Sequence, residues 1–476
     1  MIKDGVRNSN SIGRAAEEFA GAQLGDERRT KRLIKIAAAV ERDPAISFPK
    51  AMRSDAELEA FYRFINNDGF SAAHILEPHR EATWDRAKAY GDVLVIHDTT
   101  HVELPGEPRS GMGLTTTGHY GFLAHVSLVV SRHGLTPLGV PRIETIVRTG
   151  TKWSRRKKRR SVVAKKDPSR ESLRWLRAVQ DVEEARIGNF DALHVTDAEG
   201  DFFELFSAMR DAGARFIIRA GQLSRVVFNG ELRRPLVDVV NDIPQRLTRT
   251  IEISSRKKNM GNAAAATKRH PPRRARTVRV AIGATRIEIP RTYYSTKTED
   301  AVAVNLVHVW ETSPEKGEPE IEWVLLTTEP IRTKADLENI IDTYRCRWII
   351  EDFFKALKTG CALEKRQTES YAAMCRVLSL LAPIACRLLL FRAALRDAPN
   401  AKAATLFDVV ELKLLAEAQV KPAPIPKTIE QALALLARLG GHLRNNGAPG
   451  WQTLARGYET LLSLKLGWKI AQKCDR

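Results

Sequence analysis

The stretch from residue 92 to residue 98 reads Asp-Val-Leu-Val-Ile-His-Asp, and it decides the fold. Four apolar residues in a row, with no polar alternation, are typical of a central strand that is buried on both faces. Residues 192–197 repeat the pattern as Ala-Leu-His-Val-Thr-Asp. We therefore expect two buried strands that carry Asp98 and Asp197 at their carboxyl ends.

The segments around these two strands predict a mixed sheet with helices packed on it. Three strands are followed by helix, strand, helix and strand, an order typical of α/β folds. A hairpin is expected around His133-Gly134. The hairpin strands are predicted at residues 123–132 and 135–148, the helices at 169–187 and 202–211, and the next strand at 215–219.

The rest of the chain divides around this core. Residues 221–320 break the alternation with short strand-like pieces, so we interpret them as a β-rich insertion. A strand at 322–328 and the longest helix of the chain, at 334–359, are predicted to follow. Helical patterns fill both ends. The predicted domains are a helical one at 1–75, a catalytic one at 76–370 and a helical one at 371–476.

One helix near the N-terminus is a candidate DNA-recognition element. Asp26 can cap it, and Arg28, Arg32 and Lys35 fall at i, i+4 and i+7 on one face. A solvated charged helix is the alternative interpretation of the same pattern.

Composition favours a polyanionic partner. The 476 residues carry a formal net charge of +19, with a pI near 9.8. Residues 148–166 hold ten Lys or Arg and residues 256–279 hold nine, and neither run contains an acid. Such runs are usually solvated loops, but here phosphate contact is the better interpretation.

Several other classes of protein are excluded or disfavoured. The most apolar stretch, residues 377–391, is too short to span a membrane and contains Arg387. We expect no signal peptide, because the first 20 residues hold no continuous apolar run. The five cysteines show no Cys-x-x-Cys spacing, which fits a reducing cytoplasm. No glycine-rich phosphate loop is present, so no nucleotide cofactor is expected.

The chemistry is expected where the two aspartates meet. If their strands are neighbours, Asp98 and Asp197 project into one cleft, and their mutual repulsion favours a hard divalent cation between them. The helix at 334–359 adds a third carboxylate, Glu351. On a regular helix it shares one face with Tyr344, Arg347 and Lys358. An exposed helix face laced with ion pairs is the alternative. A histidine metal site at His97 and His101 is disfavoured, because their spacing falls on a strand and loop.

These motifs resemble a known family. Asp98-Thr99-Thr100, Thr196-Asp197 and the pattern Tyr-x-x-Arg-x-x-x-Glu-x-x-x-x-x-x-Lys are similar to the bacterial cut-and-paste DDE transposases of the Tyr-Arg-Glu-Lys group. That group includes the transposase of the kanamycin-resistance composite transposon. The resemblance extends from about residue 20 to residue 360. Further similar stretches are Leu24-Gly25-Asp26, Arg28-Arg29-Thr30, Tyr62-Arg63-Phe64-Ile65 and Lys358-Thr359-Gly360.

The resemblance implies a ribonuclease-H-like catalytic core, an N-terminal DNA-binding domain and a C-terminal dimerisation domain. It implies Mg2+, or Mn2+ in its place, held by Asp98, Asp197 and Glu351. Hydrolytic nicking, hairpin formation, hairpin opening and joining of the 3′ ends to target DNA would follow, within a homodimer on double-stranded DNA. The implied DNA-contacting residues are Tyr344, Arg347, Lys358, Trp323, Arg219 and Lys355, together with Arg28, Arg29 and Arg32 of the N-terminal helix.

Two positions depart from the family pattern. His97 stands where the family has an acidic residue, and Phe354 replaces a polar residue on the catalytic helix. Two other functions remain as alternatives: a structure-selective nuclease without strand transfer, and a DNA-binding regulator without catalysis. A cytoplasmic bacterial protein, associated with the nucleoid when bound to DNA, is expected in every case.

Overall fold

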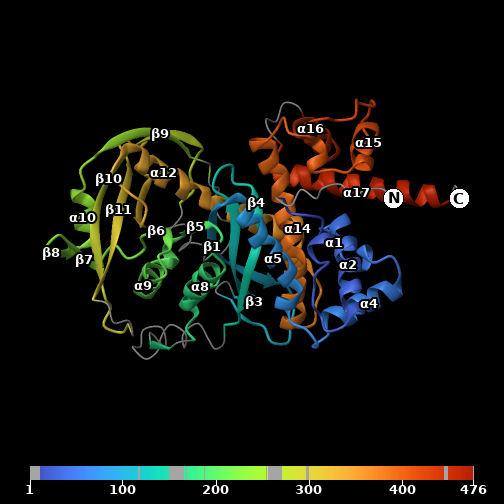
Figure 1. The fold of residues 1–476 in the computed structure, drawn as a ribbon, viewed down its shortest axis with the longest axis horizontal. Helices are drawn as coiled ribbons and strands as arrows, with labels where there is room; N and C mark the ends of the chain where they lie inside the picture. The colour runs from blue at the N-terminus through green and yellow to red at the C-terminus, as the bar shows by residue number, and fades with distance from the viewer. Residues whose placement is uncertain are drawn as a thin grey trace.

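A sheet of 12 strands runs through the centre of the protein in the order β2-β3-β1-β5-β6-β12-β11-β10-β7-β8, with β4 beside β3 and β9 beside β10 (Figure 1). The computed structural model describes residues 11–115, 118–148, 166–167, 169–186, 188–253, 255, 271–295, 300–443 and 449–474. Residues 149–165 and 256–270, which hold much of the two basic runs, lie outside the described residues.

The predicted α/β core is present, with helices packed against a mixed and mostly antiparallel sheet. Strand β1 pairs in parallel with β5, and β5 pairs in parallel with β6, while β3 and β4 form the predicted antiparallel hairpin. The core strands are β1 (Asp92–Leu104), β2 (Gly113–Leu114), β3 (Tyr120–Ser131), β4 (Pro137–Ile146), β5 (Asp191–Thr196), β6 (Arg215–Arg219) and β12 (Glu322–Thr327).

The segment between β6 and β12 extends the same sheet outward. It leaves the core after β6 and returns as β12, which pairs antiparallel with β6. Its elements are β7 (Val226–Asn229), β8 (Leu232–Pro235), α10 (Leu236–Asp242), β9 (Leu247–Ile253), β10 (Arg276–Pro290) and β11 (Ala301–Glu311). The long strands β10 and β11 pair over eleven residues, so this segment is held to the core by continuous backbone hydrogen bonding.

The two faces of β1 contact different helices. Leu94 and Ile96 belong to a large apolar core that includes Ile350 and Phe353. Val93 and Val95 belong to a separate cluster with Val182 of α8 (Arg174–Arg186). Because side chains alternate along a strand, His97 lies on the α8 face and Asp98 on the opposite face. Helix α9 (Phe203–Asp211) contacts β11 farther along the sheet.

The N-terminal region is helical, as the sequence predicts. Asp26 caps α2 by accepting a hydrogen bond of 2.8 Å from the backbone nitrogen of Arg28. Residue 75, where the sequence places the end of the first domain, lies inside α5. Helix α5 packs against β4 and α14 and is part of the central body. The helices are α1 (Ala15–Glu18), α2 (Glu27–Arg42), α3 (Phe48–Ala51), α4 (Asp55–Ile65) and α5 (Ala72–Tyr90).

The longest helix in the described part of the chain is α14 (Tyr371–Asp397), and the prediction that residues 334–359 hold this rank is wrong. By length and composition α14 could cross a membrane, but its most apolar window is wholly buried in the fold. It stands between the sheet and the N-terminal helices and contacts α5, β4 and α17 (Figure 1). The other C-terminal helices are α15 (Val409–Glu417), α16 (Ile429–Leu439) and α17 (Trp451–Cys474).

The segment predicted as one regular helix at 334–359 changes its winding along its length. Helix α12 (Lys334–Arg345) is followed by a 3-10 turn (Cys346–Trp348), by α13 (Ile349–Lys355) and by a π-helical turn (Ala356–Gly360). A 3-10 turn winds faster than an α-helix and a π turn winds more slowly. The predicted single face therefore does not extend evenly from Tyr344 to Lys358.

Candidate active site

Asp98 and Asp197 lie side by side at the centre of the sheet. The parallel register pairs Asp92 with Asp191 and continues to Ile96 opposite Val195. Each aspartate follows two residues beyond that last pair, and the charge of Asp197 acts on Asp98. Neighbouring strands are about 4.8 Å apart, and residues of equal register project from the same face. The strands are thus neighbours, as the predicted shared cleft requires.

Glu351 reaches this pair from the helical segment on the same face. The guanidinium of Arg347 contacts Asp98 Oδ2 at 3.0 Å and Glu351 Oε1 at 3.3 Å, so one cation bridges the two carboxylates. The charge of Asp197 also acts on Arg347 and on Tyr344. The structure therefore gathers three acids, distant in the sequence, around one arginine.

The electrostatics of this cluster favour a cation. Burial, followed by the negative charge of Asp197, raises the pKa of Asp98 to about 7, and the contact with Arg347 offsets only part of that rise. Burial also raises the pKa of Glu351. Carboxylates with raised pKa values that crowd one site gain from a bound positive charge. One arginine does not neutralise three acids, so the cluster is under-compensated.

The oxygen donors suit a hard divalent cation, although the side chains do not form a closed cage. Among the described residues, no group of three His, Cys, Asp or Glu side chains stands close enough to hold a metal ion. Arg347 lies between Asp98 and Glu351 and forms an ion pair with each of these two carboxylates. His97 and His101 do not meet, since His97 is fully buried on the α8 face and His101 pairs with Glu103 at 3.5 Å. The donor set fits Mg2+ or Mn2+ in its chemistry.

Two aromatic side chains border the carboxylates. Tyr344 is buried, which raises its pKa, while the charges of Arg347 and Arg219 act in the other direction. The half-buried Trp323 lies 6.1 Å from Tyr344 between ring centroids, at an interplanar angle of 58°. Arg219 donates to the backbone oxygen of Glu322 at 3.4 Å, so it flanks the strand that carries Trp323.

The two lysines of the helical segment lie farther along. Lys358, on the π turn, donates to the backbone oxygen of His101 and pairs with Glu364 at 2.9 Å. It is therefore fixed to β1 beyond Asp98, away from Arg347. The side chain of Lys355 is 58% exposed and pairs with Asp352 at 3.5 Å, on the solvent side of α13.

The three N-terminal arginines have different surroundings. The side chain of Arg28 is 93% exposed. Arg32 and Lys35 line a groove of about 630 Å³ between α2 and α17, into which Arg42, Arg53 and Lys465 also face. Arg29 turns inward, donates to the backbone oxygen of Leu24 at 2.9 Å and lies over the ring of Phe70. These contacts give Arg29 a structural role, and its predicted contact with DNA stays a prediction.

The structure adds one aromatic residue that the sequence did not single out. Trp348 is 44% exposed and follows Arg347, whose guanidinium carbon lies 5.6 Å from the centre of its ring. The sequence alone does not reveal that Trp348 is exposed, because its exposure depends on the 3-10 turn in which it lies. It presents a flat surface beside the carboxylates.

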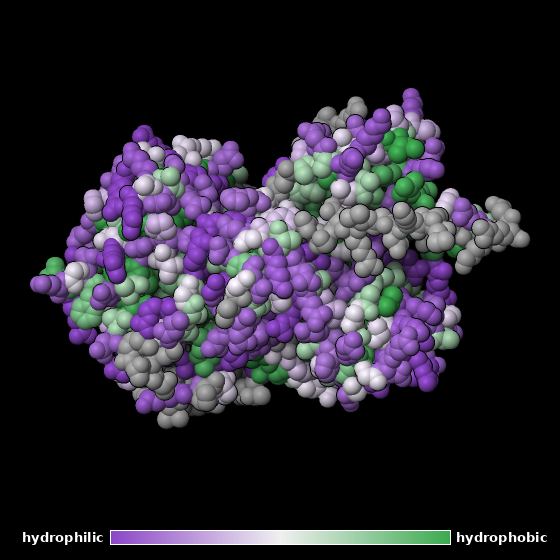
Figure 2. Space-filling model, in the orientation of Figure 1, coloured by the Kyte–Doolittle hydropathy of each residue, from purple (hydrophilic) through white to green (hydrophobic). Residues whose placement is uncertain are grey.

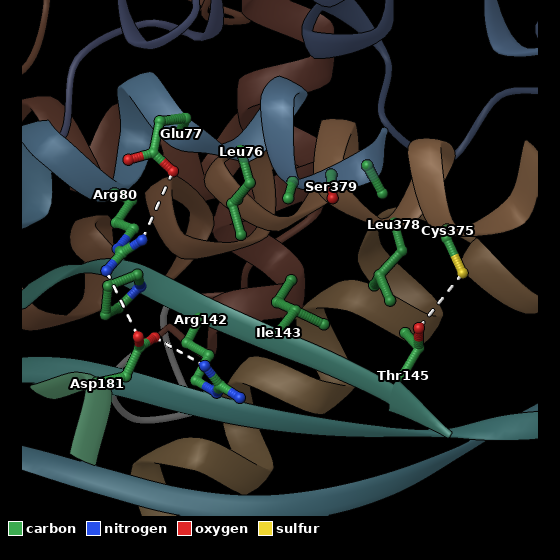
Figure 3. A pocket seen from close by; sticks show the side chains of 13 residues that line it. Leu76, Glu77, Arg80, Arg142, Ile143, Thr145, Asp181, Cys375, Leu378 and Ser379 are labelled. Atoms are coloured by element: carbon green, nitrogen blue, oxygen red, sulfur yellow. Dashed lines mark hydrogen bonds and ion pairs between the residues drawn. The ribbon is translucent and has the colours of Figure 1, made fainter. Parts of the chain in front are cut away.

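A smaller cavity, of about 160 Å³, lies between α5, β4 and α14 (Figure 3). Its charged side chains pair with one another: Asp181 contacts Arg142 at 2.8 Å and Arg80 at 3.5 Å. Arg80 also reaches Glu77 at 3.7 Å. Because these charged side chains already pair with one another, the cavity is a weaker candidate for the active site than the carboxylate cluster.

Two family models match the sequence. Residues 13–70 match a model described as transposase DNA-binding, and residues 174–384 match a model described as the transposase DDE domain. The chain carries the two domains of a DDE transposase. Asp197 and Glu351 lie inside the DDE match, whereas Asp98 precedes it. The DNA-binding match covers α1 to α4 and ends before α5 begins.

The two domains define the class of protein. A transposase DNA-binding domain makes DNA the partner. A DDE domain makes the transposase a metal-dependent enzyme that acts on DNA, because domains of this family generally use divalent cations, and it implies a ribonuclease-H-like fold. The carboxylate cluster is the feature of the structure best suited to that chemistry.

Proposed function

We propose that the chain is a cut-and-paste transposase that binds the ends of its element, cleaves them by hydrolysis and hairpin formation, and joins the 3′ ends to target DNA. The observation that carries the proposal is the convergence of Asp98, Asp197 and Glu351 on one face of the sheet. The order of steps is taken from the resemblance to the Tyr-Arg-Glu-Lys group.

In this proposal, Asp98, Asp197 and Glu351 hold Mg2+, with Mn2+ able to substitute. The bound ion supplies activation of the attacking oxygen and neutralisation of charge at the phosphate. Arg347 keeps Asp98 and Glu351 near each other and offers a guanidinium to a phosphate oxygen. The strand order β4-β3-β1-β5-β6, with β1 in the middle, supports the ribonuclease-H-like assignment.

The residues around the cluster are proposed to hold distorted DNA. Trp323 would stack on an unpaired base, since its side chain is only half-buried and its ring borders Tyr344 at 6.1 Å between centroids. Arg347 and Lys358 would contact the backbone on either side of the cut, and Arg219 and Lys355 the flanking phosphates. Trp348 is a second exposed aromatic surface at the same place.

The N-terminal helices are proposed to recognise the end of the element. Arg28 and Arg32, with Lys35, present positive charge from one side of α2. Each phosphate they neutralise releases counterions, so binding should weaken as salt rises. The net charge of +19 supports broad contact with DNA in addition.

A homodimer is proposed for the complex that holds two ends. Exposed apolar side chains gather on the C-terminal helices, and Figure 2 shows hydrophobic surface over α15. Burial of such a surface in a second copy would stabilise the pair. The residues are Val409 of α15, Val420 and Ile425 beyond it, and Leu464, Trp468 and Ile470 of α17. The protein would act in the bacterial cytoplasm, on the nucleoid.

The test uses the full chain, linear DNA that carries the inverted repeats flanking the gene, and a supercoiled target plasmid. Wild-type protein with Mg2+ should release hairpin ends and then joined products. Asp98→Asn, Asp197→Asn and Glu351→Gln should each lower cleavage by more than the about 10- to 100-fold that follows when a residue supporting a metal ligand is lost. Binding of end DNA should persist in all three.

Matched acids provide the controls. Asp191→Asn changes the first residue of β5, and Glu338→Gln changes an exposed acid of α12; both should cleave as the wild type does. Cleavage without joined target DNA would support the nuclease alternative. Binding without cleavage by wild-type protein would support the regulator.

A further inference from the structure

A row of buried polar side chains crosses the sheet directly behind the two aspartates. Ser127 Oγ lies 3.0 Å from His97 Nδ1, His97 Nε2 lies 2.9 Å from His194 Nδ1, and His194 Nε2 lies 2.9 Å from Glu183 Oε1. The side chains of Ser127, His97 and His194 are fully buried. The two imidazole rings are nearly coplanar, at an angle of 8° with centroids 5.2 Å apart, as an edge-to-edge hydrogen bond requires. The row connects β3, β1, β5 and α8.

The hydrogen bonds of this row have one consistent direction. Glu183 is held as a carboxylate by Arg186, at 2.7 Å, so it accepts from His194 Nε2. His194 Nδ1 then accepts from His97 Nε2, and His97 Nδ1 accepts from the Ser127 hydroxyl. Each imidazole donates once and accepts once. The row is fully satisfied with both rings neutral, and burial lowers the pKa of His97 well below its usual value.

A second connection crosses the same two strands on the other side of Asp98. Arg174 of α8 donates from Nε to Thr99 Oγ1 at 2.9 Å and pairs through Nη2 with Glu199. Thr99 follows Asp98 on β1, and Glu199 follows Asp197 in the turn after β5. Asp98 is therefore bracketed by His97 and Thr99, both fixed on the α8 face.

These side-chain connections begin where backbone pairing ends. The parallel ladder between β1 and β5 stops at Ile96 and Val195, before either aspartate. Two carboxylates at the open end of a ladder repel each other, and no β1–β5 backbone pair is present beyond Ile96 and Val195 to hold these two strands together there. On the α8 face, the hydrogen bond from His97 to His194 and the contacts of Arg174 with Thr99 and Glu199 connect the ends of β1 and β5.

We propose that the row of Ser127, His97, His194 and Glu183, together with Arg174, positions Asp98 and Asp197 for metal binding by fixing the ends of β1 and β5. This inference rests on the proposed function, because it assumes that the two aspartates are metal ligands. These are positioning residues, since none of them touches the cluster itself. Mg2+ requires nearly ideal octahedral geometry while Ca2+ accepts irregular sites, so the spacing of the aspartates should matter more for Mg2+.

The experiment compares His97→Gln, His194→Gln, the double variant and Arg174→Gln in the full chain. Mg2+ and Ca2+ affinities are measured by calorimetry. Each single variant should weaken Mg2+ binding about 10-fold, as loss of a supporting partner does, and Ca2+ binding by less than about threefold. The double histidine variant should lose no more than the worse single one, because both changes break the same bond.

Amide hydrogen exchange of the metal-free protein gives a readout independent of metal. Peptides from residues 92–104 and 191–201 should exchange faster in the variants, while β10 and β11 stay unchanged. His79→Gln is the matched control, since His79 is an equally buried, hydrogen-bonded histidine on α5. It should lower the melting temperature similarly but leave Mg2+ affinity and the exchange of β1 and β5 as in the wild type.

Asp98→Asn, measured alongside, separates the two levels of the proposal. If Asp98→Asn loses Mg2+ binding and the histidine and Arg174 variants keep it, the positioning role is overturned and the active site stands. If Asp98→Asn binds Mg2+ like the wild type, the active site and the positioning role are both overturned. Equal losses of Mg2+ and Ca2+ affinity in His79→Gln and in the histidine variants would show general destabilisation and would also overturn it.

Discussion

Two buried carboxylates, Glu18 near the N-terminus and Asp98 at the centre of the sheet, differ in what surrounds them. Glu18 contacts Arg86 Nη1 at 2.9 Å, the backbone nitrogen of Gly13 at 2.8 Å and the Nδ1 of His79. Burial alone would raise the pKa of Glu18, but His79 and Arg86 hold it at about 2. Asp98 shares its one arginine with Glu351 and lies beside Asp197, and its pKa is raised to about 7.

The difference shows that the pKa of a buried carboxylate, and its effect on stability, depend more on its charged and hydrogen-bonding partners than on how deeply it is buried. The acid of Glu18 has complementary donors for both oxygens and ties α1 to α5, so its charge stabilises the fold. The acid of Asp98 is left with like charges around it, an arrangement that weakens the fold and suits a binding site. The first site is complete within the protein, and the second calls for a cation from outside.

The largest effect is expected at the complete site. Glu18→Gln leaves Arg86 buried without its counter-charge, and breaking a buried pair in this way costs about 3–5 kcal/mol. Urea unfolding at pH 7 should show this loss. Glu17→Gln, at the exposed neighbour on α1, should change the free energy of unfolding by no more than about 0.5 kcal/mol. A loss at Glu18 as small as that would mean that the Arg86 pair is not what stabilises α1.

The opposite sign is expected at the incomplete site. Asp98→Asn removes a charge that the metal-free fold disfavours, so it should raise the free energy of unfolding at pH 8 by about 1–2 kcal/mol, typical of a stabilising substitution. Added Mg2+ should raise the melting temperature of the wild type and leave that of the variant unchanged, because a ligand stabilises only the form that binds it. A variant less stable than the wild type in metal-free buffer would contradict this assignment.

The smallest effect is a difference in pH dependence. A folded pKa of about 7 at Asp98 lies above the unfolded value, so folding retains a proton there and stability falls as pH rises from about 4 to 7. A folded pKa of about 2 at Glu18 lies below the unfolded value, so its contribution is present above about pH 4.5 and is lost as pH falls toward 2. Thermal melts of the metal-free wild type and of both variants from pH 3 to 8 measure this. The advantage of Asp98→Asn should grow between pH 5 and 8, where the deficit of Glu18→Gln stays constant.

Local patterns carried much of the fold. The apolar run before Asp98, the hairpin around His133-Gly134 and the Asp26 cap all form as the sequence predicts, because each depends on residues that are close in the chain. From the sequence, Asp98 and Asp197 could be predicted to lie together only if their two strands were neighbours in the sheet. That condition depends on strand pairing across about a hundred residues, which no local pattern encodes.

The features that the sequence did not predict also depend on contacts between residues that are far apart in the chain. A regular helix is predicted around Glu351, but the segment contains a 3-10 turn and a π turn, and the π turn packs against α14, far along the chain from β1. Arg29 follows the exposed Arg28 in the sequence, but its contacts with the Leu24 carbonyl and with Phe70 depend on folding and could not be predicted. The sequence marks His97 as a departure from the family pattern and as a disfavoured metal ligand with His101. Its partners, Ser127 and His194, come from other strands, so its place in a buried row was invisible in the sequence.

Helix α14 determines how late in synthesis the three carboxylates can come together. The inner side of α13, with Ile350 and Phe353, belongs to the same apolar core as α14, and so do the N-terminal helices. During synthesis the chain emerges from the N-terminus, so the strands bearing Asp98 and Asp197 exist long before the helix on which Glu351 rests. A nascent or prematurely terminated product that stops short of residue 397 lacks the support for its third acid. A product without α14 would therefore contain Asp98 and Asp197 but would leave α13, which carries Glu351, without part of its packing.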